Sequence, residues 1–185
     1  MRYVALLRGI NVGGRNRVAM ADLRQLAASL GHTEIATYIQ SGNLVFTSDD
    51  ESANGLADAL EQEIARSMDV RPAVVVVSRG DLAQVIADNP FPAESNPKAL
   101  HAVFRREVLT ADAIEAIAGA EQKARAKGSQ DEVVVVGRTL FLHTPDGIGR
   151  SELAAQLARV GRQAEGTARN WATVTRLMDM LDPPS

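Results

Sequence analysis

Near the amino end, an apolar run, Tyr3-Val4-Ala5-Leu6-Leu7, passes directly into Arg8-Gly9-Ile10-Asn11-Val12-Gly13-Gly14. The apolar run has the length and composition of a buried β-strand. The glycines after it let backbone amides turn toward a ligand without a clashing Cβ, and Arg8 offers a forked, permanent positive charge at the mouth of the strand. We therefore expect a phosphate or carboxylate to bind at Arg8, Asn11, Gly13 and Gly14.

The same loop also fits a purely structural role. In that interpretation Arg8 pairs with a carboxylate and Asn11 caps backbone groups. The loop is not a P-loop, because no Gly-Lys-Ser/Thr follows, and it lacks the G-x-G-x-x-G spacing of a dinucleotide fingerprint. By itself it names neither a substrate nor a reaction.

Hydrophobic periodicity extends the pattern outward from this first strand. After the strand at residues 2–8, it predicts a helix at 19–30, strands at 35–39 and 43–47, a helix at 52–68 and a strand at 73–78. The order is βαββαβ. A segment rich in turn formers follows, from Asp88 to Pro97, and we place a linker there at residues 89–98.

The second half repeats the plan of the first. It predicts a strand at 99–105, a helix at 110–126, strands at 132–136 and 139–143, a helix from about 150 and a last helix that carries Trp171. The predicted fold class is therefore α+β, with two related βαββα(β) units that have antiparallel sheets and a C-terminal helix. The first unit covers residues 1–88 and the second covers residues 99–185.

Composition limits the function classes. The chain has 185 residues, is 45% hydrophobic and contains no cysteine. It has enough apolar residues for a proper core, while disulfides, zinc-thiolate sites and thiol catalysis are excluded. Its longest apolar runs are far shorter than the roughly 18 residues typical of a membrane span. We expect a cytoplasmic protein that has no membrane partner.

Charge is distributed unevenly along the chain. The formal net charge is -3, yet residues 1–31 carry +4 and residues 138–176 carry +3. If the fold brings these segments together, they form a local positive field in a protein whose total charge repels nucleic acid. The alternative is a solvated surface of an arginine-rich protein.

A second polar cluster, Gln40-Ser41-Gly42-Asn43, lies between two predicted strands. Such residues make a tight hairpin turn without any functional demand, but they also offer many hydrogen-bonding groups at one place. We take Ser41, Gly42 and Asn43, with Trp171, as a secondary site. We expect this turn at the sheet end opposite the exit of the first strand, and hence on a different surface from Arg8.

The third cluster, Thr167-Ala168-Arg169-Asn170-Trp171, is predicted to begin the last helix. Thr167 or Asn170 would cap this helix, but a cation in the first turn opposes the helix dipole by roughly 0.3 to 1 kcal/mol. A bound anion or an acidic side chain would compensate for Arg169. We therefore add Arg169 and Asn170 to the predicted ligand site, while Trp171 suits core packing or stacking on a ring.

Catalytic signatures are missing. The three histidines are scattered, the sequence contains no G-x-S-x-G elbow, and no carboxylate pair occurs outside predicted helix caps. His143 ends a strand and suits either a base or a satisfied neutral imidazole. We predict no metal and no cofactor, and we leave open whether the protein is an enzyme.

The chain resembles the bacterial domain-of-unknown-function family 1697. The resemblance rests on the segments 5–14, 37–43 and 167–171, and it extends to Asn89-Pro90-Phe91 and to residues 142–151. It implies a two-part α+β fold related to ferredoxin-like units and an unassigned biochemical role. Family members often have lysine after the Gly-Arg-Ser segment, where this chain has Glu152.

Three function classes remain open. The first is binding of a small anionic ligand, phosphate- or carboxylate-bearing, at the basic glycine loop. The second is an RNA or nucleic-acid binder on a ferredoxin-like scaffold, although the chain is poor in the aromatic residues that such domains use. The third is a non-catalytic structural or assembly module whose arginines form salt bridges. The sequence leaves the oligomeric state open.

Overall fold

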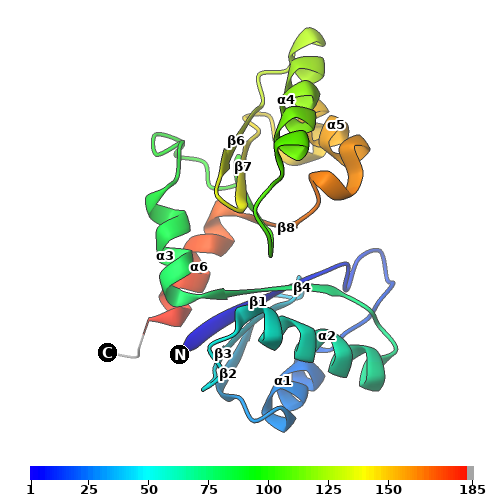
Figure 1. Ribbon diagram of the computed structural model, residues 1–185, viewed down its shortest axis with the longest axis vertical. Helices are drawn as coiled ribbons and strands as arrows, with labels where there is room; N and C mark the ends of the chain where they lie inside the picture. The colour runs from blue at the N-terminus through cyan, green and yellow to red at the C-terminus, as the bar shows by residue number, and fades with distance from the viewer. Residues whose placement is uncertain (183–185) are drawn as a thin grey trace. The chain divides into compact units, whose positions relative to one another are not determined.

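The structure, a computed structural model, describes residues 1–182 and comprises two compact units (Figure 1). Of the described residues, the first unit contains Met1–Gln84 and residues 176–182, and the second contains Val85–Thr175. Of the helices within residues 1–182, none is long and apolar enough to span a membrane.

The first unit has the predicted βαββαβ order. Its elements are β1 (Arg2–Arg8), α1 (Met20–Ser29), β2 (Thr33–Tyr38), β3 (Asn43–Thr47), α2 (Ala53–Met68) and β4 (Ala73–Ser78). The four strands form an antiparallel sheet in the order β2-β3-β1-β4. The predicted bounds of β1, β3 and β4 agree with the structure, because each strand is a short, nearly continuous apolar run between turn residues.

The core of this unit lies between the sheet and its two helices. Tyr3, Ala5 and Leu7 alternate along β1 on the face that packs against α1 and α2. The other face of β1 is buried as well, since Val4 and Leu6 are both 0% exposed. The central strand is therefore apolar on both faces and ends abruptly at Arg8.

One helix, α3 (Arg79–Ala87), follows β4 directly and was not expected from the sequence. The Ser78 side chain caps its start. The Ser78 hydroxyl accepts a hydrogen bond from the Asp81 backbone N–H (3.1 Å) and donates one to the Asp81 carboxylate (2.8 Å). The Ser-x-x-Asp spacing could have indicated the start of a helix. The helix itself was missed because it is short and its apolar residues are only weakly periodic.

The second unit repeats the architecture of the first. Its elements are β5 (Leu100–Phe104), α4 (Ala111–Ala126), β6 (Glu132–Val136), β7 (Thr139–His143), η1 (Ile148–Arg150), α5 (Glu152–Val160), η2 (Gly161–Gln163) and β8 (Thr167–Asn170). The last helix, α6 (Trp171–Leu181), begins in this unit, and its residues from Arg176 belong to the first unit. The sheet order, β6-β7-β5-β8, corresponds strand for strand to that of the first unit. This antiparallel βαββαβ topology is ferredoxin-like, which confirms the predicted fold class.

The fourth strand of the second unit, β8, corrects the prediction for residues 167–170. These residues do not begin the last helix; they form β8, which pairs antiparallel with β5 and places Arg169 opposite Ala102. The strand approaches β5 closely because Gly166 precedes it: a Cβ at that position would lie 2.7 Å from the Phe104 carbonyl oxygen. Four residues with three polar side chains are too few for periodicity to reveal a strand.

Candidate functional site

The loop after β1 and the turn between β2 and β3 lie side by side. Because β3 runs antiparallel to β1, Asn43 at the start of β3 is opposite Leu6 near the end of β1. The Leu7 N–H donates to the Gly42 carbonyl oxygen at 2.8 Å. The expectation that this turn lies at the opposite end of the sheet from the exit of β1 is therefore wrong. We call residues 8–18 the arginine loop and residues 39–42 the β2–β3 turn.

The Asn11 side chain ties three segments together. Its Nδ2 donates to the carbonyl oxygens of Val18 and Gln40, each at 2.9 Å, and its Oδ1 accepts from the Val18 N–H at 2.9 Å. Asn11 has φ +53°, a left-handed conformation that asparagine tolerates better than most residues. These bonds fix the arginine loop to the β2–β3 turn and to the residues before α1.

The tip of the arginine loop is a small hairpin. Val12 and Arg15 form an isolated antiparallel bridge, and Gly13 and Gly14 between them have φ +56° and +76°. Two consecutive positive φ angles are what the tight two-residue turns of hairpins require, and glycine adopts them without strain. The tip is exposed, and Val12 keeps 67% of its surface accessible.

Three arginines belong to this loop. Arg8 ends β1 and is half-buried, whereas Arg15 and Arg17 are exposed. Within residues 1–182, neither Arg15 nor Arg17 forms an ion pair. Of these three arginines, only Arg8 was predicted as a ligand-binding residue. The signal for Arg15 and Arg17 was their position directly after the Gly13-Gly14 turn.

The arginine loop leads into a helix start that has no side-chain cap. The N-cap residue of α1 is Ala19, with extended dihedral angles, and no side chain accepts a hydrogen bond from the first amides. The first turn carries Asp22, and Arg24 donates to the Thr37 hydroxyl at 2.6 Å. Uncapped amides at a helix start favour negative charge.

The residues of the β2–β3 turn serve mainly to shape it. Asn43 is fully buried, and its Nδ2 donates to the Tyr38 carbonyl oxygen (2.9 Å) and to the Ser41 hydroxyl (3.1 Å). Gly42 has φ +83°, and a Cβ there would lie 2.6 Å from Ile10 Cδ1. Of the predicted secondary site, Ser41 remains exposed beside the arginine loop.

Arg169, Asn170 and Trp171 belong to the second unit. Arg169 is only 9% exposed, and burial lowers the pKa of its guanidinium to about 10, so that it stays protonated at neutral pH. The Asn170 Oδ1 accepts from the Thr173 N–H at 2.9 Å and so caps α6, as expected. The Trp171 ring lies 6.3 Å from that of Phe141. Because Arg169 lies on β8, it does not oppose the dipole of the last helix, and this part of the prediction is wrong.

A separate polar cluster surrounds His143. Its Nε2 lies 2.7 Å from Glu94 Oε2, its Nδ1 lies 3.5 Å from Glu132 Oε1, and its ring stacks on Phe91 at 4.8 Å. The Asn96 backbone N–H and the His143 ring lower the pKa of the Glu94 carboxyl. This geometry ties the segment before β5 to β7. Among residues 1–182, no group of three His, Asp or Glu side chains is suited to hold a metal ion.

Comparisons with known proteins place the chain in a family. It belongs to the protein family of unknown function DUF1697, whose model matches residues 1–141 and thus includes the arginine loop and the β2–β3 turn but not β8. A conserved bacterial protein from Streptococcus pneumoniae has a similar structure, with a TM-score of 0.75 and 27% identity over 98% of each chain. No curated protein matches the chain.

Proposed function

We propose that this protein binds a small phosphate- or carboxylate-bearing ligand at the arginine loop. The observation that carries the proposal is the Asn11 clamp, which holds a loop with Arg8, Arg15 and Arg17 against the β2–β3 turn and before an uncapped helix start. Holding the loop in advance reduces the entropy lost on binding. In this proposal Asn11 positions the site, because its amide is already committed to three hydrogen bonds.

The remaining groups of the site have complementary roles. Arg15 and Arg17 supply exposed guanidinium groups, which form charge-assisted and often bidentate hydrogen bonds to phosphate and carboxylate. The amides of Gly13 and Gly14 are open to solvent and have no Cβ beside them. The amides at the start of α1 add a partial positive charge.

Arg169 and Asn170, which were predicted to belong to the same ligand site, lie in the second unit, whereas the arginine loop lies in the first. Arg169 carries a buried positive charge on β8, while the side-chain oxygen of Asn170 is occupied by the cap of α6. We therefore propose the site at the arginine loop without these two residues.

Two further functions are less well supported. Binding of RNA on the sheet needs exposed aromatic rings, whereas Tyr3 on β1 and Phe46 on β3 are both buried in the core. An assembly role for the arginines fits Arg2, Arg66 and Arg79, which pair with Glu34, Glu63 and Asp182. It does not account for Arg15 and Arg17.

The test is titration with inorganic phosphate, pyrophosphate and AMP, with thermal unfolding as the readout. We expect at least one probe to stabilise the protein, by roughly 2.7 kcal/mol at 100 times its Kd. The double variant Arg15→Gln/Arg17→Gln removes charge-assisted hydrogen bonds of about 1.5–3 kcal/mol each and should raise Kd at least tenfold.

The matched control is Arg66→Gln, which removes a surface arginine of the same unit outside the arginine loop. It should leave Kd unchanged. Failure of all three probes to stabilise the protein, or equal weakening by the control, would refute the proposal. If the variants instead change salt-dependent retention of an RNA oligonucleotide, with no effect of the small probes, the RNA function is favoured.

A further inference from the structure

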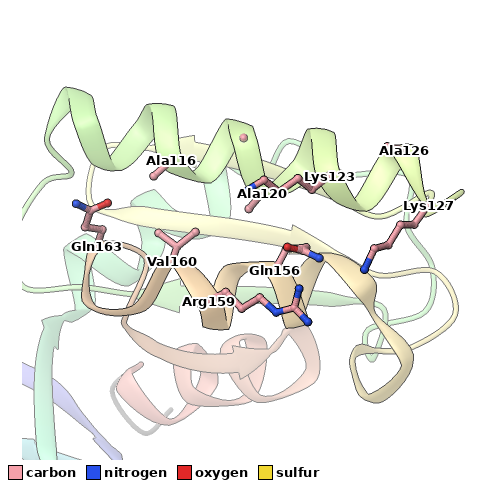
Figure 2. Close-up of a pocket in the computed structure, with 10 residues that line it drawn as sticks. Ala116, Ala120, Lys123, Ala126, Lys127, Gln156, Arg159, Val160 and Gln163 are labelled. Atoms are coloured by element: carbon pink, nitrogen blue, oxygen red, sulfur yellow. The ribbon is translucent and has the colours of Figure 1, made fainter.

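A groove of about 660 Å³ lies in the second unit, between α4 and the segment formed by α5 and η2 (Figure 2). One part of its lining is small and apolar, with Ala116, Ala120 and Val160. Its volume falls in the range of about 300 to 1,000 Å³ that is typical of small-molecule sites. The groove belongs to neither the arginine loop nor the β2–β3 turn.

Gly119 leaves a recess in the wall of this groove. It lies in the middle of α4, where glycine costs roughly 0.5 to 1 kcal/mol relative to alanine. A Cβ built at Gly119 would meet no atom within 4 Å, so packing does not require a glycine there. The glycine therefore leaves the lining of the groove without a side chain at this position.

The polar part of the lining is strongly cationic. Among the ten described residues that line the groove are Lys123, Lys127 and Arg159, and none of the ten is acidic. Glu152, which lies outside the lining, accepts hydrogen bonds from Lys127 Nζ and from Gln156 Nε2, both at 2.6 Å. This carboxylate balances one of the three cations and holds Lys127 and Gln156 in place.

The charged side chains gather toward one end of the groove. Figure 2 shows Lys127, Gln156 and Arg159 toward this end, and Ala116, Val160 and the uncharged Gln163 toward the other. Gln156 is buried, with 5% of its surface exposed, and its hydrogen bond to Glu152 fixes its side chain at the charged end of the groove. A ligand that matches both ends has an anionic headgroup and a short apolar body.

We propose that this groove binds a small amphipathic anion, such as a medium-chain carboxylate. The headgroup lies between Lys123, Lys127 and Arg159, and the apolar body lies over Ala116, Gly119 and Val160. Charge complementarity selects an anion, since the lining contains three cations and no acidic residue. The apolar part of the lining favours a ligand with an apolar body, such as a hydrocarbon chain.

Isothermal titration of the full chain with decanoate tests the proposal, with decyl phosphate, decanol and acetate as comparison probes. Decanoate should bind, while decanol and acetate should bind at least tenfold more weakly. Decanol lacks the anionic headgroup, and acetate lacks the apolar body. Decyl phosphate tells whether the headgroup site also accepts phosphate. Equal binding of acetate would mean an adventitious ion only, and equal binding of decanol would mean an apolar surface only; either result overturns the proposal.

Variants locate the binding in the groove. Gly119→Leu should abolish decanoate binding, and it should keep or raise the thermal stability, because leucine is the better helix former and the recess has room for it. Arg159→Gln should weaken binding about tenfold through loss of one charged hydrogen bond. The control Arg125→Gln removes a cation from α4, the helix that carries Gly119, at a position outside the groove lining.

Unchanged decanoate affinity in both Gly119→Leu and Arg159→Gln refutes the proposal, as does equal weakening by Arg125→Gln. Should Gly119→Leu fail to fold, Arg159→Gln and its control decide alone. Pyrophosphate binding at the arginine loop should be insensitive to Gly119→Leu. The groove and the arginine loop are thereby tested independently.

Discussion

Individual residues in unusual backbone conformations shape the arginine loop and its neighbouring turn. Ile39 has φ +49°, a left-handed conformation that a β-branched residue adopts only under constraint, and it is 50% exposed. The next residue, Gln40, accepts a hydrogen bond from Asn11. Strain of this kind persists only where the surroundings enforce it and is common at functional sites.

Gly42 provides a residue-scale prediction. Gly42→Ala should lower the free energy of unfolding by about 2–4 kcal/mol, because a Cβ would lie 2.6 Å from Ile10 Cδ1 and 2.9 Å from Leu7 Cβ in addition to the strain of φ +83°. Urea denaturation measures the change. Gly14→Ala is the matched control, since φ is +76° there but a Cβ meets nothing within 4 Å. Equal losses in the two variants would show that the close packing against Ile10 is unimportant.

At the scale of elements, the helices differ in how they begin. Ser52, Thr110 and Ser151 cap α2, α4 and α5 by accepting a hydrogen bond from a backbone N–H three residues on. Helix α1 begins with Ala19, which has the extended dihedral angles of an N-cap but no acceptor. The missing cap lowers the stability of α1 at its first amides, and the proposed ligand would bring negative charge to the same amides.

Ala19→Ser should therefore raise the free energy of unfolding by about 1 kcal/mol, because the hydroxyl would accept from a free amide of α1. Equilibrium urea unfolding without ligand gives the value. The reciprocal variant Ser52→Ala removes an existing cap of α2 and should lower stability by a similar amount. No gain from Ala19→Ser, alongside a normal loss from Ser52→Ala, would mean that the start of α1 is already satisfied.

At the scale of the whole molecule, each unit contains a histidine whose pKa is lowered by burial. His32 packs in the first unit with its ring 4.5 Å from that of Phe46, and desolvation outweighs the opposing charge of Asp50. His101 lies on β5 of the second unit, where desolvation alone lowers its pKa. Both side chains therefore stay neutral in the folded protein at pH values where the unfolded chain is protonated.

Stability should consequently fall as the pH is lowered through about 6.5, the usual pKa of an unfolded histidine, and level off below the lowered folded pKa values. The double variant His32→Gln/His101→Gln should flatten the unfolding free energy between pH 7 and about 5, measured by urea denaturation. A slope unchanged in this variant would contradict the prediction. A second loss below about pH 4 belongs to Glu34, Glu94 and Glu152, whose pKa values are lowered by their hydrogen-bond partners.

Elements whose pattern lies in neighbouring residues were predictable from the sequence, whereas an element that depends on a distant partner strand was not. Strands β1, β3 and β4 and helices α2 and α4 were predictable, because their apolar residues repeat within a few positions. Strand β8 was missed because it is short and its partner, β5, lies about 60 residues earlier. The repeated βαββαβ plan, which calls for a strand after α5, was the signal that could have revealed it.

The amino-acid sequence by itself determined the two related α+β units and the chemistry of the arginine loop, because periodicity, glycine and charge are properties of neighbouring residues. Only the tertiary structure decided that the β2–β3 turn adjoins that loop, that Arg169 is buried on a strand, and that α4 and α5 enclose a cationic groove. These features depend on strand pairing and helix packing between distant segments. Hydrophobic patterns favour such pairing without specifying which partners meet.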